Sequence, residues 1–570
     1  MDNQQRLLIW AFFGMMLWFT YTAWQQDYGP KPVQRPAPAV EDAAPAMPGE
    51  DDLALPEITE STDDVPSLTA PVTGVAEAPL AEPAGVISVK TDVLDLQIST
   101  LGGTLVRAAL PAYPVAKDQP DVPVVLLDTA REDLGLIRTG LRSADATQPG
   151  PGHTATFVAD RDAYELGDAD EIVVPMSWSD GSGVEVEKRY RFTRGGYAIQ
   201  VEQTLTNNTD APWRGDQYSQ ILRRSYELER SMFNVDSYSF DGPIVYDGEK
   251  SDKLDRDDLL DDGPYRLTAE NGWVASIQHH FLSAMVPDRN AQHIYQVQVA
   301  GNTMTASAVG AKRTIAPGQS HTFTRTLFVG PKLQGQLEDI DKSLKLTVDY
   351  GWLTILSNPL FWLLSKAFAV FANWGAAIIA VTILIKLVFY KLTESSGRSM
   401  AKMRNLQPRL KTIQERYKDD RQAQSQAMMD LYKREKVNPA AGCLPILIQM
   451  PFFLAFYWVL LESVEMRQAP FMLWITDLSS RDPYFILPLI MGGAMFLQQK
   501  LNPQVGDPVQ VRVMQIMPVI FTVFFAFFPS GLVLYWVTNT ILSIAQQWKI
   551  NKVVEREAKE KKGGKKTRKD

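Results

Sequence analysis

Residues 513–548 read VMQIMPVIFTVFFAFFPSGLVLYWVTNTILSIAQQW, and this stretch decides the fold. It holds two runs without a charged residue, Val513–Phe528 and Leu532–Trp548, separated only by Pro529-Ser530-Gly531. A bilayer core about 30 Å thick needs roughly 17–25 mainly apolar residues in a crossing helix, because backbone polar groups cannot stay unpaired in hydrocarbon. The stretch therefore predicts two membrane-spanning helices joined as a tight hairpin.

Further apolar runs predict four more membrane spans. The first lies at the N-terminus, where Leu7–Trp24 contains no charge. A cleaved signal peptide is the alternative for this run, but its basic region is only Arg6 and no small-residue cleavage pattern follows. We therefore expect residues 1–24 to be an uncleaved anchor. The other three runs are Trp374–Tyr390, which is interrupted only by Lys386, Leu444–Leu461 and Tyr484–Gln499.

The distribution of basic residues predicts the topology. The loop 393–437 holds 11 Lys and Arg, and the tail from Lys549 holds 10 more. Six spans with a cytoplasmic N-terminus place both of these segments inside, in agreement with the positive-inside rule. Gly351–Ala372 is also apolar enough to span, but a seventh span would move the 11-charge loop outside, and Asn358-Pro359 interrupts the run. Residues 341–372 are therefore expected to form an interfacial amphipathic helix.

Net charge divides the chain into two unlike halves. Residues 25–350 hold 28 Lys and Arg against 50 Asp and Glu, whereas residues 351–570 hold 28 against 15. An acidic half joined to a basic, apolar half excludes a single homogeneous globule. The one cysteine, Cys443, excludes a disulfide framework and a cysteine-rich metal site.

The acidic half has two parts. Residues 25–84 contain 11 of the 36 prolines with many Ala, Asp and Glu, a composition that predicts a disordered linker. From residue 85 to 340, polar and apolar residues alternate with a period of two, as in Val184-Glu-Val-Glu and His321-Thr-Phe-Thr-Arg. This pattern predicts a large β-sandwich, which the topology places in the periplasm.

The predicted β-sandwich shows no motif for catalysis or for binding a cofactor. It lacks a phosphate-binding glycine loop, a His-Glu-x-x-His motif and a nucleophile elbow. The only close histidines are His279-His280, and neighbouring residues of a strand point to opposite faces, so a shared metal is not expected. We predict no catalytic residue, no cofactor, no metal and no DNA partner.

The cytoplasmic segment 394–437 is predicted to form a helical hairpin of two amphipathic helices that turn at Tyr417-Lys-Asp-Asp420. It could be a self-packed hairpin with a solvated basic face, or a methionine-bearing basic surface that contacts client peptide or ribosome. The basic tail 549–570 could bind anionic lipid or ribosomal RNA through phosphates. Candidate contact residues in the hairpin are Met400, Met403, Arg404, Met428 and Met429.

Lys386 is the ionisable residue that needs an explanation, because it lies inside an apolar run. An ionised lysine near the bilayer centre costs roughly 2.5–3.5 kcal/mol on insertion scales. Snorkelling is the simple alternative, since Lys386 is only five residues from the boundary residue Lys391. Other predicted spans also carry polar residues at mid-depth, and none of these is acidic. They predict a hydrated cavity or groove lined by Lys386, Thr382, Gln449, Trp536, Asn539 and Ser543.

Three sequence motifs stand out in the apolar half: Asn438-Pro-Ala-Ala-Gly-Cys-Leu-Pro-Ile-Leu-Ile-Gln-Met-Pro-Phe-Phe453, Arg467-Gln-Ala-Pro-Phe471 and Phe528-Pro-Ser-Gly-Leu-Val-Leu-Tyr-Trp536. They resemble signatures of the YidC family of bacterial membrane protein insertases. The order of anchor, β-domain, amphipathic helix, apolar core and basic tail is also similar. Three positions depart from the family pattern: Lys386 stands where arginine is common, Ala440-Ala441 where Gly-Gly is common, and Trp536 where tyrosine is frequent.

The resemblance implies a polytopic α-helical membrane protein whose six spans include a five-helix insertase core, residues 373–548, beside a periplasmic β-sandwich. It further implies a non-enzymatic insertase and chaperone of the inner membrane, whose hydrophilic groove is open to the cytoplasm and to lipid. Lys386 matches the positive residue of that groove. The implied partners are nascent membrane proteins, the lipid bilayer, the ribosome and components of the Sec translocon.

Two other classes of protein stay open on the residues alone. A secondary transporter would show internal repeats and several intramembrane ionisable residues, and the chain shows no repeat and one such lysine. A membrane-anchored periplasmic binding or sensor protein would place its function in residues 85–340. Five closely spaced spans with polar faces are more than an anchor requires.

Overall fold

The structure, a computed structural model, describes most of the chain from residue 85 onward. The expected anchor 1–24 and linker 25–84 lie outside the described residues, as does the 438–443 part of the first motif. The described residues are 85–566 other than 131, 146–147, 226–238, 290, 419, 436, 438–443 and 502–507.

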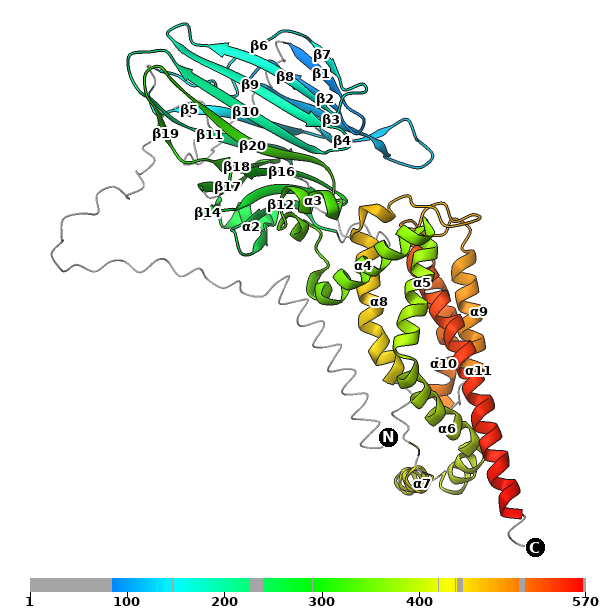
Figure 1. Ribbon diagram of the computed structural model, residues 1–570. Coiled ribbons are helices and arrows are strands. Elements are labelled where there is room, and N and C mark those ends of the chain that lie inside the picture. Colours follow the sequence, from blue (N-terminus) through cyan, green and yellow to red (C-terminus); the bar gives the residue numbers. More distant parts are fainter. Residues whose placement is uncertain are drawn as a thin grey trace, which may run out of the picture.

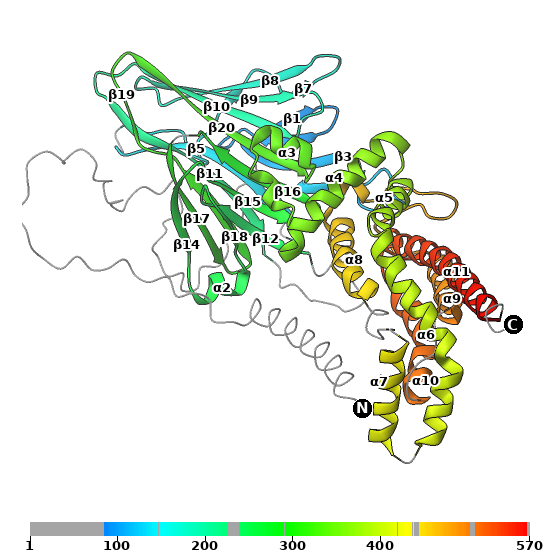
Figure 2. The same cartoon turned by 60° about the horizontal axis from the view of Figure 1, so that its bottom comes forward.

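The alternating segments form strands whose side chains point alternately inward and outward, as the period of two requires. In β9 (Val184–Thr193) and β10 (Ala198–Asn207) alternate residues are buried, and both strands lie in one antiparallel sheet with β20 (Gln319–Pro331). Two sheets pack into a β-sandwich (Figures 1 and 2), which agrees with the expected β-domain.

The strand order of the two sheets mixes segments from the whole domain. In the larger sheet the order is β14 (Tyr265–Glu270), β17 (Gln292–Ala300), β18 (Thr303–Val309), β11 (Trp213–Arg224), β5 (Gly135–Ser143), β3 (Thr104–Pro114), β2 (Asp95–Ser99), β1 (Val86–Lys90) and β7 (Ala163–Glu165), with β19 (Arg313–Ile315) on β11 and β4 (Pro123–Leu127) on β3. In the smaller sheet it is β13 (Ser251–Lys253), β12 (Asp241–Tyr246), β15 (Trp273–Gln278), β16 (Phe281–Pro287), β20, β10, β9, β8 (Glu171–Ser179) and β6 (Val158–Ala159). Two short helices, α2 (Arg256–Asp261) and α3 (Gln334–Ile340), complete the domain.

The expectation for the histidine pair is wrong in its geometry. His279 and His280 do not lie in a strand, because they form the turn between β15 and β16, where His279 has a positive φ of 50°. Their rings stack at 3.7 Å between centroids instead of pointing to opposite faces. Among the described residues no group of three or more His, Cys, Asp or Glu is arranged to hold a metal ion.

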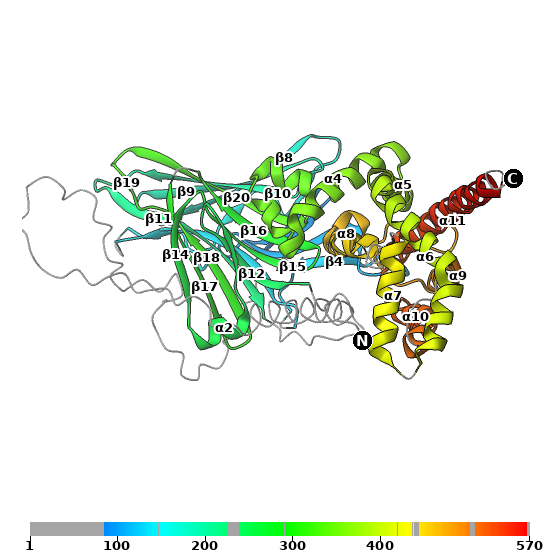
Figure 3. The same ribbon diagram turned by 90° about the horizontal axis from the view of Figure 1, so that it is seen from below.

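The apolar runs form a bundle of helices beside the β-domain (Figure 1). Seen from below, α8 lies between the β-domain and α5 (Figure 3). The long helix α11 packs against α9, α5 and α6. The helices are α4 (Thr354–Phe371), α5 (Trp374–Val388), α6 (Tyr390–Arg416), α7 (Arg421–Arg434), α8 (Leu444–Glu462), α9 (Ile486–Leu501), α10 (Pro508–Phe525) and α11 (Ser530–Lys566).

Helix lengths do not by themselves give six spans. Among the described residues, one helix, Gly351–Phe371, is long and apolar enough to cross a membrane, and α5 with α6 would be a second if this pair, bent by 69°, is one span. The apolar parts of α8, α9 and α10 are shorter. The helix that passes the length test is the one expected at the interface, and it runs across the end of the bundle that faces the β-domain (Figure 1).

The predicted tight connection between the last two apolar runs is present. α10 ends at Phe525 and α11 begins at Ser530, whose backbone N–H donates to Ser480 O at 2.7 Å. The Gly531 N–H donates to Leu478 O at 2.9 Å, so the hairpin tip is held by the loop that precedes α9. No pattern in the sequence relates this loop to the hairpin tip.

The β-domain is joined to α8 by buried polar contacts. Lys332 Nζ donates to Glu462 Oε2 at 3.0 Å, and the two side chains are only 1% and 8% exposed. Ser239 Oγ donates to the other carboxylate oxygen at 3.0 Å. The ring Nε2 of His279 lies 3.1 Å from Leu461 O. These contacts fix the end of α8, whose opposite end carries Gln449.

Glu465, just beyond α8, gives the junction a pH dependence. Its Oε2 is buried without a hydrogen-bond partner among the described residues, and burial raises the pKa of the carboxyl to about 7. The Glu465 carboxyl therefore binds more protons in the folded state than in the unfolded state between about pH 4.5 and pH 7. The free energy of unfolding falls as the pH rises through this window, because the buried carboxyl must then give up its proton.

We expect Glu465→Gln to melt at a higher temperature than the parent at pH 8 and at a similar temperature at pH 5. The exposed Glu249→Gln is the control, and a Glu465→Gln effect of equal size at both pH values would contradict the assignment.

The second motif, Arg467–Phe471, packs against the start of α5. The Asn373 side chain caps α5 by accepting from Ala376 N at 2.9 Å, and its Nδ2 donates to Phe471 O at 2.9 Å. A Cβ at Gly375 would lie 2.1 Å from a ring carbon of Phe471, so only glycine fits. The motif therefore depends on the absence of a side chain at Gly375.

Gly375→Ala is expected to destabilise the protein by about 1–3 kcal/mol, the usual cost of overpacking. Thermal melting of the purified protein measures this loss. Gly493→Ala is the control, since a Cβ there meets nothing within 4 Å. Equal melting temperatures for the two variants would contradict the packing described.

Candidate functional site

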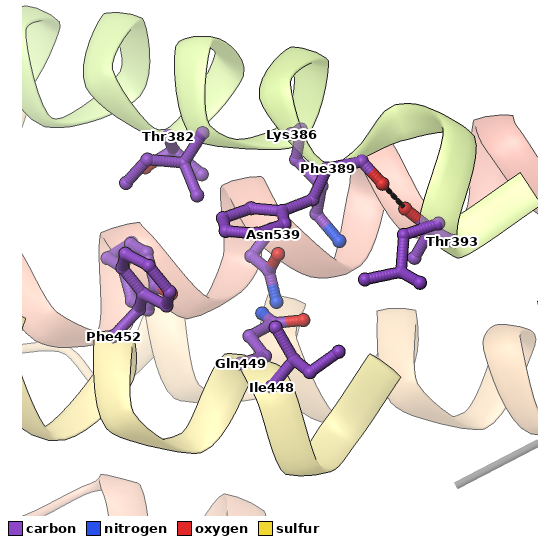
Figure 4. Close-up of a pocket in the computed structure, with 11 residues that line it drawn as sticks. Thr382, Lys386, Phe389, Thr393, Ile448, Gln449, Phe452 and Asn539 are labelled. Carbon is purple, nitrogen blue, oxygen red and sulfur yellow. Dashed lines mark hydrogen bonds between the residues drawn. The ribbon is translucent and has the colours of Figure 1, made fainter. Parts of the chain in front are cut away.

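A cavity of about 40 Å³, with a mainly apolar wall that includes a few polar side chains, lies between α5, α6, α8 and α11. One water needs roughly 10–15 Å³ of such space, so the cavity has room for a few water molecules. Figure 4 shows the side chains of Lys386, Gln449 and Asn539 pointing into the same space from three different helices. The lining residues are Thr382, Ile385, Lys386, Phe389, Leu392, Thr393, Ile448, Gln449, Phe452, Tyr535 and Asn539.

Lys386 is held by α11 and not by a carboxylate. Its Nζ donates to Ser543 Oγ at 2.8 Å, and that hydroxyl donates in turn to Asn539 O at 2.7 Å. None of the described residues that line the cavity is acidic. A buried cation without a counter-ion is costly unless water or an anion solvates it. The cavity is therefore suited to a negatively charged guest.

The other polar residues of the cavity add no charge. Thr382 is 1% exposed, and its hydroxyl donates to Ile378 O at 2.6 Å within its own helix. Asn539 is 8% exposed, and its amide lies beside that of Gln449 (Figure 4). Amides can donate and accept, so these two side chains can exchange hydrogen bonds with water or with a peptide.

The structure brings together five of the six residues predicted for the groove. Thr382, Lys386, Gln449 and Asn539 line the cavity, and Ser543 contacts the lysine. Trp536 does not line it.

Trp536 belongs to an aromatic cluster at the contact of α8, α10 and α11. Its ring lies 4.8 Å from that of Phe453 and 5.3 Å from that of Phe525. The preceding residue, Tyr535, lines the cavity in its place.

The apolar wall of the cavity was missed by the sequence analysis. Phe389 lies at the bend between α5 and α6, and its ring meets that of Phe452 edge-on at 5.3 Å. A polar residue within an apolar run stands out in a sequence. An apolar residue in the same run does not, because the sequence does not indicate whether its side chain faces the cavity.

The methionines of the hairpin formed by α6 and α7 lie between its two helices. Met403 is 5% exposed in a cluster with Leu406, Leu410 and Tyr432, and Met400, Met428 and Met429 pack against this cluster. Arg404 is exposed. The packing favours the self-packed hairpin, with a basic outer surface, over a surface of exposed methionines.

Large apolar side chains on the outside of the bundle are exposed to an extent unusual for a water-soluble protein. Those on α5, α9, α10 and α11 include Leu387 at 64%, Val388 at 71%, Leu489 at 65%, Val523 at 60% and Trp548 at 54%. A widely apolar exterior, together with a lysine inside the bundle, differs from the pattern of a soluble helical bundle. The fold and the site therefore define a class: a membrane-embedded helical bundle with a cationic internal cavity and an attached β-sandwich.

Comparison with known proteins identifies the family. The family model described as "60Kd inner membrane protein" matches residues 366–558, and the model described as "YidC periplasmic domain" matches residues 86–363. The "Membrane protein insertase YidC" of Thioalkalivibrio sulfidiphilus is 46% identical over 98% of this chain and 100% of its own length. The protein of the same name from Nitrosococcus oceani is 45% identical, also over 98% of this chain and all of its own length. The chain belongs to the YidC family.

Proposed function

We propose that this protein is a membrane protein insertase that receives hydrophilic segments of nascent proteins in the cavity around Lys386. The observation that carries the proposal is a cationic cavity, free of carboxylates among its described lining residues, inside a bundle with an apolar exterior. The names of its relatives support the same activity.

In the proposed mechanism a short polar segment of the client, often acidic, enters the cavity and is attracted to Lys386. The amides of Gln449 and Asn539 replace part of the water that the segment loses. The adjoining hydrophobic segment leaves along the exposed apolar face of α5, where Leu387 and Val388 lie, into lipid. No covalent bond is made or broken, so the protein needs no catalytic residue, cofactor or metal.

The proposed topology has six spans, with both termini in the cytoplasm and residues 25–350 in the periplasm. α4 lies at the interface, and the α6–α7 hairpin lies on the side away from the β-domain (Figure 2). Charge supports this placement, because the 11 basic residues of the loop 393–437 and the 10 of the tail then face inward. The ribosome is the proposed partner of these basic segments, and the Sec translocon is a further proposed partner for some clients.

Single cysteines can test this topology. In a Cys443→Ser background, Lys418→Cys and Lys552→Cys are expected to react with an impermeant thiol reagent only from the cytoplasmic side. Glu185→Cys in β9 is expected to react only from the periplasmic side. All three positions are exposed, so burial does not confound the comparison. Labelling of Lys418→Cys from the periplasm would contradict the six-span arrangement.

Reconstitution tests the activity. Purified protein in lipid vesicles is expected to make a newly synthesised client protease-protected, whereas vesicles without protein leave it accessible. A secondary transporter would instead move a small solute and leave the client unprotected. Equal client protection in vesicles with and without the protein would overturn the proposed function.

A further inference from the structure

A second, larger cavity of about 770 Å³ lies where the β-domain meets the ends of α8 and of the α10–α11 hairpin. It is formed by the β3–β4 loop, the His279-His280 turn, the end of α8 and the loop that precedes α9. The residues used below are Lys117, His280, Leu461, Arg467, Asp477, Arg481 and Phe527, all of which line it.

The cavity has an excess of positive charge. Lys117, Arg467 and Arg481 line it together with one carboxylate, that of Asp477. This carboxylate is already occupied by its own loop, because it accepts from the backbone N–H groups of Gln468 and Ser479 at 3.1 and 2.8 Å and from the hydroxyl groups of that loop. The Arg481 side chain is exposed to the cavity mouth. An anion would therefore meet cations whose charge Asp477 compensates only in part.

His280 adds no charge to the wall of the cavity. It is 7% exposed, and burial, His279, Lys332 and Arg467 hold its pKa well below the usual value, so the ring is neutral. Its Nδ1 is enclosed by protein and has no hydrogen-bond partner among the described residues, so it is not open to an occupant of the cavity. The charge of the wall is therefore set by the lysine, the two arginines and Asp477.

Apolar residues on one side of the cavity belong to the ends of the proposed spans. Leu461 lies at the last turn of α8, and Phe527 lies just before the tip of the α10–α11 hairpin and is 37% exposed. In the proposed topology, these residues sit at the periplasmic boundary of the bilayer. The cavity therefore adjoins the level of the lipid headgroups of the outer leaflet.

We propose that this cavity binds the headgroup of an anionic phospholipid, of which phosphatidylglycerol is a simple example. The phosphodiester lies against Arg481, Arg467 and Lys117, and the glycerol ester end rests on Phe527 and Leu461. The excess positive charge favours a headgroup with net negative charge over a zwitterionic one. The inference rests on the proposed topology and makes no assumption about the client protein.

Native mass spectrometry of the full-length protein tests the site. The protein is released from nanodiscs of phosphatidylcholine with phosphatidylglycerol, and the phosphatidylglycerol that stays bound is counted. Loss of charge-assisted hydrogen bonds is expected to weaken retention of one lipid about tenfold in the double variant Lys117→Gln/Arg481→Gln. The double variant Lys250→Gln/Arg313→Gln, which removes two exposed cations elsewhere on the β-domain, is the control and should retain the lipid as the parent does.

The readout separates this inference from the proposed function, since no client is present. Retention unchanged in Lys117→Gln/Arg481→Gln would overturn the site, as would equal retention of phosphatidylcholine by the parent. Displacement of the lipid by millimolar-range glycerol phosphate, but not by chloride at equal ionic strength, would assign the cavity to a soluble phosphate ester and overturn the lipid as its occupant. A variant that loses the lipid but inserts clients normally would support the lipid site as separate from the groove.

Discussion

Replacing Lys386 by glutamate is expected to reduce insertion of clients with acidic translocated segments more than any other single change in the bundle. Two charges about 4 Å apart interact by roughly 1 kcal/mol in water and 4 kcal/mol at an effective dielectric constant of 20. A partly wet cavity lies between these limits, and about 1.4 kcal/mol is a factor of ten. Lys386→Ala should therefore lower insertion of acidic clients about tenfold, and Lys386→Glu should lower it further because it repels them.

The conservative and control variants separate charge from geometry. Lys386→Arg is expected to insert clients normally, since it keeps the charge that Ser543 and the cavity accommodate. Clients with neutral segments should be affected little by Lys386→Ala. Lys391→Ala, which removes a lysine one turn and a half further along, is the matched control. If Ala, Arg and Glu variants at 386 inserted acidic clients as the parent does at equal expression, the lysine would be a snorkelling residue.

Breaking the buried pair Lys332–Glu462 is expected to cause the largest loss of stability. Removing one partner of a buried ion pair leaves an uncompensated charge and typically costs about 3–5 kcal/mol. Lys332→Met and Glu462→Leu should each melt at a much lower temperature than the parent. The combined Lys332→Met/Glu462→Leu should recover most of the loss, because it removes both charges.

An exposed pair provides the matched control for this prediction. Lys345 and Glu338 lie 2.9 Å apart, but each side chain is 48% exposed. Exposed pairs contribute about 0–1 kcal/mol, so Lys345→Met should change the melting temperature little. Equal losses from Lys332→Met and Lys345→Met would show that burial at the junction does not matter.

Part of the fold could be predicted from the sequence because one-dimensional patterns specify it. The period of two in residues 184–207 gives β9 and β10, and the short break Pro529-Ser530-Gly531 gives a tight turn between α10 and α11. Such patterns do not indicate which helices and strands contact one another. Lys332 and Glu462 are 130 residues apart, and no periodicity relates them.

The polar residues of the candidate site could be predicted, because polar side chains are unusual within apolar runs. Lys386, Gln449 and Asn539 stand out as polar residues in apolar runs, and they do converge on one cavity. Trp536 was predicted to line the groove with Asn539, yet its ring packs on that of Phe453. The hairpin methionines show a related limit, since helical spacing puts Met403 and Leu406 on one face but does not say what covers it.

Site-specific photocrosslinking tests the central claim most directly, namely that a client's polar segment occupies the cavity of α5, α8 and α11. A photoreactive amino acid is placed at Gln449 in the cavity, or at Val523 on the exposed face of α10 as the control, and a client with an acidic segment is arrested during synthesis. The account predicts that position 449 crosslinks to the acidic segment and position 523 does not. Crosslinking of that segment to position 523 alone, or to neither position while the client is inserted, would contradict the account.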